Sequence, residues 1–355
     1  MTATSCCAYL SWKPTPPPNQ KDRQMVYCLK ITGWTLAALA LLPILLLAGL
    51  RGAAAWREAG VETVPQGRFI ETSLGDVFSQ EWGDPDGPVV ILVHGTMAWS
   101  AFWDDTAKHL AKHGWRVVAI DLPPFGYSER IEPYDRSTQA QRLLDIASHY
   151  PEPPVIVGHS FGAGPVMQAA LTDPESFDAV VVVNAALGLE TVGQSLPGIL
   201  QSETVRELGV AASMTNPLIT QRLVEMFLTF PDQLQAETVA TLQAPLSRPG
   251  TTAAYAQWSS ELLAPAVTRS HLSASYAEFP LPLHILWSDL DKVTPLVQGQ
   301  ALAQLVPGAR LTILEQSGHI PQIETPEAFH SALAAALNGL RFDRPVPPPP
   351  QEGQE

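Results

Sequence analysis

Residues 153–164 read PPVIVGHSFGAG, a short apolar run that breaks at two glycines placed around a serine. Residues 155–157 are typical of a buried strand, residues 158–162 spell G-x-S-x-G, and an apolar helical pattern follows at 163–171. The glycines fit a sharp, strained turn in which larger side chains would collide with the neighbouring strand and helix. Ser160 would then lie at a helix N-terminus, where free N–H groups favour developing negative charge. Strand, turn and helix in this order predict a nucleophile elbow rather than a plain loop.

The chain around this stretch alternates between apolar strand patterns and helical patterns. Continuous apolar runs are typical of strands in a parallel sheet that is covered on both faces. The alternation predicts an α/β fold with a doubly wound, mostly parallel sheet and right-handed crossovers, preceded by a β-hairpin. The predicted hairpin strands are 69–72 and 77–82, the other strands 88–93, 115–120, 179–183, 283–287 and 310–314, and the helices 102–113, 137–149, 163–171 and 326–337.

The alternation stops after Asn184. Residues 187–276 contain amphipathic helical patterns and no convincing buried strand, and residues 223–230 form one strongly apolar piece among them. A segment of this length exceeds any normal crossover between strands. We therefore predict a helical cap at 187–276, inserted into a core made of residues 64–186 and 277–340.

An apolar segment precedes the predicted core. Residues 31–50, ITGWTLAALALLPILLLAGL, include no charged residue. A helix of this length rises about 30 Å, the thickness of the hydrocarbon core of a bilayer. The segment predicts a single transmembrane helix between a polar, proline-containing tail (1–30) and a linker (51–63). A cleaved signal peptide and a buried core helix are the alternatives, which the length of the run and its uniform apolarity disfavour.

The flanks of the apolar segment carry an asymmetric distribution of basic residues. The positive-inside rule favours, by a narrow margin, a single-pass membrane protein whose globular domain lies outside the cytoplasm. Residues 341–355 are rich in proline and predict a solvated tail. The basic residues are Lys13, Lys21, Arg23 and Lys30 before the segment, and Arg51, Arg57 and Arg68 after it.

Composition excludes some classes of function. The net charge is −14, which argues against nucleic-acid binding because that activity needs a basic face. The three cysteines are Cys6, Cys7 and Cys28, so the globular part has neither a disulfide nor a thiolate metal site. We expect no metal and no cofactor. The sequence gives no indication of oligomeric state.

A serine hydroxyl needs an adjacent base, which is itself oriented by a third group. In a doubly wound sheet such groups lie at the C-terminal ends of strands. Asp291 follows the predicted strand 283–287, and His319 follows the strand 310–314. Asp289 is the rival acid. Asp121 also ends a strand, but the Leu-Pro-Pro that follows it indicates a structural turn.

These motifs together resemble the α/β-hydrolase superfamily over about residues 64–340. The resemblance rests on His94-Gly95-Thr96, residues 121–128, the G-x-S-x-G, Asp291 with Pro295, and Gly318-His319. It implies that Ser160 is the nucleophile, His319 the general base and then acid, and Asp291 the orienting carboxylate. It also implies an oxyanion hole made by the backbone N–H groups of Thr96 and Phe161. Ser288 departs from the family, which often has glycine there.

The expected chemistry is two-step acyl transfer on an apolar ester. Aromatic and apolar residues near the presumed active edge and in the cap favour an apolar acyl or aromatic substrate. A serine nucleophile disfavours the epoxide hydrolase and haloalkane dehalogenase branches, which use aspartate there. The alternatives are C–C bond hydrolysis, thioester cleavage or acyl transfer on the same triad, and a non-catalytic, membrane-tethered binding protein. The predicted substrate-binding residues are Met97, Trp99, His159 and Trp258.

Overall fold

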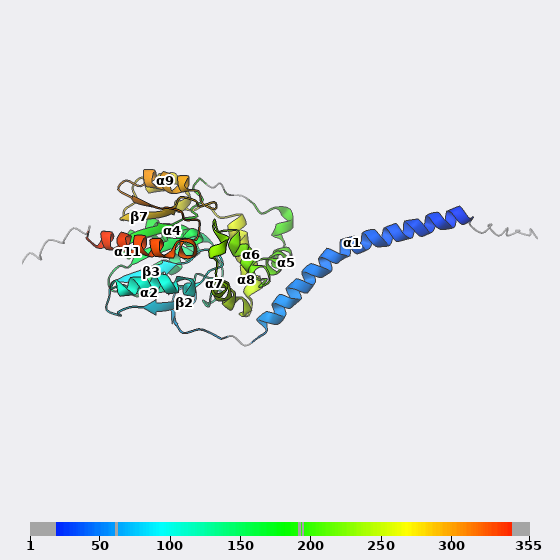
Figure 1. Cartoon of the computed structure of the whole chain (residues 1–355), viewed down its shortest axis with the longest axis horizontal. Coiled ribbons are helices and arrows are strands. Elements are labelled where there is room, and N and C mark those ends of the chain that lie inside the picture. Colours follow the sequence, from blue (N-terminus) through cyan, green and yellow to red (C-terminus); the bar gives the residue numbers. More distant parts are fainter. Residues whose placement is uncertain (1–18, 61–62, 191–192, 194, 343–355) are drawn as a thin grey trace, which may run out of the picture. The chain divides into compact units, whose positions relative to one another are not determined.

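The computed structural model describes residues 19–60, 63–190, 193 and 195–342, and it is shown in Figure 1. The chain divides between Gly49 and Leu50 into two units. The second unit contains the sheet, the layers of helices on its two faces, and the cap.

An eight-stranded sheet forms the centre of the second unit, in the order β1-β2-β4-β3-β5-β6-β7-β8. Strands β1 and β2 form the predicted antiparallel hairpin, β2 pairs antiparallel with β4, and the other neighbours are parallel. The predicted doubly wound α/β sheet is confirmed. Its strands are β1 (Arg68–Ile70), β2 (Val77–Trp82), β3 (Val89–Val93), β4 (Arg116–Ile120), β5 (Val155–His159), β6 (Ala179–Val183), β7 (Leu283–Ser288) and β8 (Arg310–Leu314).

The central strands are continuously apolar because both of their faces are buried. In β3, Ile91 and Val93 pack on one side of the sheet, while Val90 and Leu92 pack on the other. Successive side chains of a strand point to opposite faces, so each strand serves two separate cores. One core is completed by α3 (Arg136–Ala147), α4 (Ala163–Thr172) and α9 (Leu296–Leu305), and the other by α2 (Asp104–Lys112) and α11 (Pro326–Phe342).

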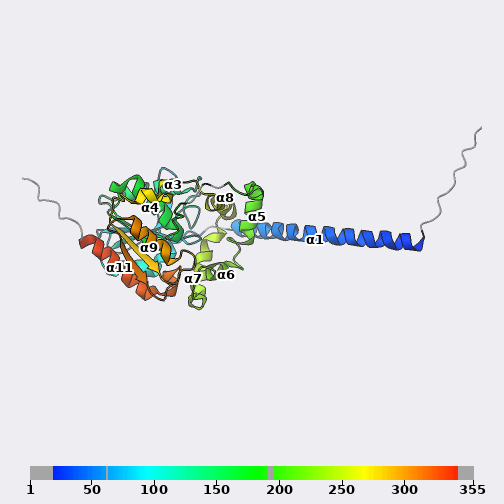
Figure 2. The same cartoon turned by 90° about the horizontal axis from the view of Figure 1, so that it is seen from above.

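The cap follows β6 and is helical, as predicted. Figures 1 and 2 both show its helices gathered on one side of the second unit, away from α11. No strand occurs among the residues of 187–276 that the structure describes, from which 191, 192 and 194 are missing. The cap helices are α5 (Glu203–Ala212), α6 (Thr220–Glu225), α7 (Ala236–Gln243) and α8 (Thr251–Leu263).

Short helices complete the secondary structure of the second unit. One of them, α10 (Pro321–Glu324), directly follows the loop that carries His319. The 3-10 helices are η1 (Ser100–Trp103), η2 (Ser160–Gly162), η3 (Pro174–Ser176), η4 (Gly198–Gln201), η5 (Pro231–Gln233), η6 (Ala244–Ser247), η7 (Arg269–His271) and η8 (Ser273–Tyr276).

Helix α1 (Gln20–Glu58) is longer at both ends than the predicted transmembrane helix. The linker predicted at 51–63 is helical as far as Glu58, because cap contacts hold these turns. The Arg51 guanidinium donates to Glu207 at 2.7 Å, and the Glu58 carboxylate accepts the N–H of Thr252 at 3.0 Å. Glu58 lies at the N-terminus of α8, where free N–H groups favour a negative charge. Residues 61 and 62 of the predicted linker lie outside the described residues.

The predicted tails also differ from the structure at their inner ends. The polar tail predicted at 1–30 is helical from Gln20, and its residues 1–18 lie outside the described residues. Residues 20–30 are rich in good helix formers such as lysine, glutamine and arginine, which favour extending the helix. At the other end α11 continues to Phe342, and residues 343–355 lie outside the described residues.

Among the described residues, α1 is long and apolar enough to cross a membrane. It continues through Pro43, and none of its most apolar window is buried, unlike a helix of a protein core. Length and composition fit a membrane anchor and a signal sequence alike.

Candidate functional site

Ser160 lies at the sharp turn between β5 and η2, with a φ of 50°. This left-handed conformation is strained for most residues other than glycine and asparagine, as expected of a nucleophile elbow. The flanking glycines are needed for space. A Cβ atom at Gly158 would lie 2.7 Å from the Cα of Ala163, and one at Gly162 would overlap the carbonyl oxygen of His94. The turn therefore places Ser160 at the C-terminal edge of the sheet, in front of helix α4.

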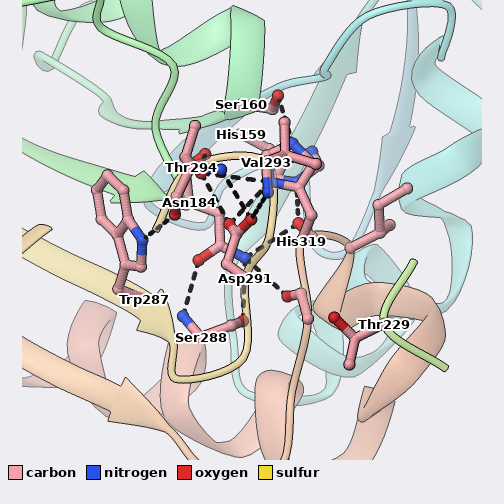
Figure 3. A network of polar contacts seen from close by, with 12 residues as sticks. His159, Ser160, Asn184, Thr229, Trp287, Ser288, Asp291, Val293, Thr294 and His319 are labelled. Atoms are coloured by element: carbon pink, nitrogen blue, oxygen red, sulfur yellow. Dashed lines mark hydrogen bonds and ion pairs between the residues drawn. The ribbon is translucent and has the colours of Figure 1, made fainter. Parts of the chain in front are cut away.

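The structure brings Ser160, His319 and Asp291 together from three separate loops (Figure 3). The Ser160 hydroxyl donates to Nε2 of His319 at 2.8 Å. Nδ1 of His319 donates to Oδ2 of Asp291, also at 2.8 Å. All three side chains are buried or nearly so. This is the geometry in which an imidazole can take the proton of a serine hydroxyl.

Asp291 is held as a charged acceptor. Burial by itself would raise the pKa of its carboxyl, but hydrogen bonds from His319 and Thr294 outweigh that effect and lower the pKa below its ordinary value. Oδ1 accepts the N–H groups of Val293 and Thr294, each at 2.8 Å. A depressed acid pKa stabilises the fold above the unfolded-state pKa, and this contribution is lost as the pH falls through the folded-state value. Asp291 therefore stays ionised at neutral pH.

Asp289, the rival acid, faces elsewhere. Its Oδ1 accepts the N–H of Ser317 at 3.2 Å, and it bonds to no atom of the His319 ring. Its backbone N–H donates to Leu314, so it fixes the start of the acid loop. The geometry separates the roles of the two aspartates.

Asn184 is a residue of the site that the sequence did not reveal. It lies at the end of β6, fully buried, with a φ of 43° that asparagine tolerates better than most residues. Its Oδ1 accepts the N–H of Ser288 at 2.8 Å, and its Nδ2 donates to the Ser288 hydroxyl and to the carbonyl of His319, both at 3.0 Å. One amide thus joins the strand that leads to Asp291 to the loop that carries His319, and it gives Ser288 a buried partner.

Replacing Asn184 with glycine should disturb both loops while keeping the backbone conformation available. The free energy of unfolding should fall by about 3 kcal/mol, because buried groups lose their partners. The kcat should fall by up to about a hundredfold, since the imidazole is then less well placed. Thermal unfolding and ester hydrolysis measure the two effects. Asn338→Ala, a change in α11, is the control, and equal effects of both variants would contradict the role of Asn184.

The turn after β3 carries Thr96 and Met97 into the same site. Nδ1 of His94 donates to the carbonyl of Gly95 at 2.7 Å, and Nε2 accepts the N–H of Leu122 at 3.0 Å. Burial lowers the pKa of His94 to about 4, so the ring is neutral and holds the loop rather than shuttling protons. Met97 has a φ of 60°, a second strained position next to Ser160.

Asp121 is a structural residue, as its sequence context indicated. It is fully buried and accepts the N–H groups of Ser100 and Tyr127, each at 2.6 Å. Burial raises its pKa to about 6. These bonds fix the two loops that follow β3 and β4.

A mostly apolar cavity opens between the triad and the cap. Ser160, His319, Thr96 and two of the predicted substrate-binding residues, Met97 and His159, line it. The cap contributes side chains from α6, the segment after α6, α7 and η6. These cap residues are Thr220, Leu223, Val224, Phe227, Leu242 and Leu246.

The other two predicted substrate-binding residues do not line the cavity. Trp99 packs on Tyr127 at a ring distance of 5.2 Å, and its indole N–H donates to the carbonyl of Thr241 in α7 at 2.7 Å. Trp258 is fully buried, 5.3 Å from the ring of Phe161. Both tryptophans join the cap to the core, a role that depends on how the cap helices pack.

His159 forms a hydrogen bond with the backbone of the predicted catalytic base, His319. Its Nε2 donates to the backbone carbonyl of His319 at 3.0 Å. Burial lowers the pKa of His159 to about 3, so the ring stays neutral. Among the described residues, no group of three metal-ligating side chains is placed to hold a metal ion.

Known proteins resemble this chain over about two thirds of its length. The family model for the alpha/beta hydrolase fold matches residues 88–326. A pimeloyl-[acyl-carrier protein] methyl ester esterase of Vibrio vulnificus (strain YJ016) is 25% identical over 251 residues, covering 70% of this chain and 94% of that protein. An uncharacterized protein of Mycobacterium tuberculosis (strain ATCC 25618 / H37Rv) is 27% identical over 258 residues, covering 68% of this chain and 73% of that protein.

A solved structure extends the similarity. The structure of a membrane phospholipase A, described as a novel bacterial virulence factor, superposes with a TM-score of 0.61 at 22% identity. The match covers 90% of this chain and 99% of that chain. At this identity the likeness concerns the fold alone.

Proposed function

Because the chain belongs to the alpha/beta hydrolase fold family, we propose that it is a serine hydrolase that cleaves carboxylic esters of apolar acyl or aromatic substrates. The observation that carries the proposal is the unbroken relay from the Ser160 hydroxyl through the His319 ring to the Asp291 carboxylate. Fold alone does not define chemistry, whereas such a relay activates an otherwise weak nucleophile.

The reaction would proceed in two steps. The Ser160 oxygen attacks the ester carbonyl carbon while Nε2 of His319 takes its proton, and the carbonyl electrons move to the oxygen. The C–O bond to the alcohol then breaks, and His319 returns the proton to the leaving oxygen. Water attacks the acyl-enzyme in the same way, with His319 again as base, and releases the acid and free Ser160.

The developing oxyanion needs donors. We assign this role to the backbone N–H groups of Phe161, which follows the nucleophile, and Thr96, which lines the cavity. Each donor would stabilise the transition state by roughly 3 kcal/mol. Asp291 would stabilise the imidazolium that forms on His319, and it holds the ring in the tautomer that leaves Nε2 free to accept.

Two features support a lipophilic substrate at a membrane. The cavity wall is mostly apolar, above all on the cap side. Helix α1 is long and apolar enough to anchor the chain. The relatives include a pimeloyl-[acyl-carrier protein] methyl ester esterase, whose name gives an ester of an acyl group as its substrate. We therefore propose that the protein is a single-pass membrane enzyme that acts on small apolar esters.

A panel of substrates tests the proposal against the other triad chemistries. The full-length chain in lipid nanodiscs is assayed with carboxylic esters, with the matching thioesters, and with a diketone as the substrate for C–C bond hydrolysis. We expect the highest kcat/KM for apolar carboxylic esters, with loss of that activity in Ser160→Ala. If the protein turned over only the thioester or only the diketone, its reaction would be thioester cleavage or C–C bond hydrolysis instead of ester hydrolysis. A folded protein inactive on all of them would favour a binding protein.

A further inference from the structure

The cap is bonded directly to the two loops that carry Asp291 and His319. Thr229 and Phe230 belong to the cap segment after α6, and Glu324 is the last residue of α10. One oxygen of the Glu324 carboxylate accepts the N–H of Thr229 at 2.6 Å and that of Phe230 at 2.9 Å. The other oxygen accepts the N–H of Ile320 at 3.2 Å. We call Thr229, Phe230 and Glu324 the cap bridge.

The cap bridge bonds to a residue next to His319 and to a residue next to Asp291. Ile320 is the residue after His319, and the Thr229 hydroxyl donates to the carbonyl of Leu290, the residue before Asp291, at 2.7 Å. Figure 3 shows Thr229 among the side chains drawn around His319. The same short cap segment therefore holds the acid loop and the base loop.

The Glu324 carboxylate lies in a buried site surrounded by backbone N–H groups. It is buried, with three N–H donors around it, and charge-assisted bonds of this kind are stronger than neutral ones. A Cβ atom at Gly318 would lie 2.5 Å from Oε1 of Glu324, so a side chain before His319 would displace this carboxylate from its hydrogen bonds. The bridge thus accounts for the glycine of the Gly318-His319 pair.

The bridge also fixes the wall of the cavity. Phe227, two residues before Thr229, lines the cavity, and its ring centre is 6.1 Å from that of His319, with the planes inclined by 30°. The free volume of the cavity is about 50 Å³, room for a few water molecules but not for a long acyl chain. A longer acyl group needs part of the cavity wall to move outward, and Phe227 is the part of the cap wall that lies beside the His319 ring.

From these contacts we propose that Thr229 and Glu324 are positioning residues that limit the acyl chain length the site accepts. This inference rests on the proposed ester hydrolysis. While the bridge is intact, Phe227 stays over His319 and the cavity favours short acyl groups. When a bridge bond is absent, the segment moves outward more easily, longer chains enter, and His319 is held less firmly for all substrates.

Thr229 offers a matched pair of substitutions. Thr229→Val keeps the shape of the side chain and removes its hydroxyl, whereas Thr229→Ser keeps the hydroxyl that donates to Leu290. In the full-length chain in nanodiscs, kcat/KM is measured with p-nitrophenyl butanoate and p-nitrophenyl decanoate. The ratio of decanoate to butanoate should rise roughly three- to tenfold in Thr229→Val, the factor that one hydrogen bond supplies. It should stay at the wild-type value in Thr229→Ser.

Glu324→Gln supplies a second, independent test. An amide has a single acceptor oxygen, so it serves either the cap amides or the N–H of Ile320 but not both. The decanoate-to-butanoate ratio should again rise. A purely structural role would lower both rates in parallel and leave the ratio unchanged, and that result would overturn the inference. A wild-type protein inactive on both esters would instead overturn the proposed function, and the inference with it.

Discussion

Ser160→Ala is expected to reduce kcat for ester hydrolysis by a factor on the order of 10⁶ while leaving the fold intact. The reason is that the Ser160 oxygen is the only group of the relay that forms a bond to carbon in the proposed mechanism. Within the part of the chain that the structure describes, its hydroxyl bonds to His319 alone, so its removal leaves no buried charge without a partner. Far-UV circular dichroism and thermal unfolding check the fold, and a sensitive fluorogenic ester measures the residual rate.

A second serine provides the control for this prediction. Ser176 lies on η3, away from the cavity, and its hydroxyl donates to Asp173 at 2.9 Å. Ser176→Ala should keep wild-type activity. If Ser160→Ala retained a substantial fraction of the rate in a preparation free of other esterases, Ser160 would not be the nucleophile.

Asp291→Asn should lower kcat by about 10⁴-fold with little change in KM. The amide can no longer act as an anion for the imidazolium, and it can present an N–H to Nδ1 of His319, which favours the wrong tautomer of the ring. Val293 and Thr294 donate their N–H groups to Oδ1 of Asp291, and an asparagine oxygen can replace that acceptor. The loop should therefore keep its shape while the chemistry fails.

Asp289→Asn is the matched control because it makes the same chemical change two residues away. Its side chain accepts only from the backbone of Ser317 among the bonds described, and an amide oxygen can keep that bond. Activity should remain within about twofold of wild type, as for most changes outside a site. A larger loss in Asp289→Asn than in Asp291→Asn would reverse the assignment of the acid.

The sheet could be predicted because each of its central strands is buried on both faces. A strand such as β6 (Ala179–Val183) is apolar at every position, and this signal is local to the sequence. The three residues of the relay could be placed for the same reason. Ser160, Asp291 and His319 each follow a recognisable strand, and parallel strands end at one edge of a sheet.

The parts of the site that depend on long-range packing could not be predicted. Asn184 was visible only as the end of an apolar strand, and nothing local indicates that its amide would reach His319. Glu324 lies in a short polar segment and gains its role only when the cap folds over it. Trp99 and Trp258 had the right composition for a substrate pocket, yet the orientation of the cap helices turned both into contacts between cap and core.

The conformation of the C-terminal end of α1 also depends on long-range packing and could not be predicted. Residues 51–58 have the composition of a helix or of a linker, and their conformation is decided by partners far along the chain. Arg57 donates to the carbonyl of Thr215 at 2.6 Å, and Glu58 accepts from Thr252. Hydrogen bonds between such distant residues are absent from any local pattern.

Labelling with a fluorophosphonate tests whether Ser160 is an activated nucleophile, because this reagent bonds covalently to the oxygen of a serine that a neighbouring base activates. The full-length chain is treated in nanodiscs, digested, and the modified residue is identified by mass spectrometry. We expect a single adduct on Ser160, formed far more slowly in Asp291→Asn and at the wild-type rate in Asp289→Asn. A folded protein that remains unlabelled, or that carries its adduct on another serine, would contradict the assignment of Ser160 as the nucleophile.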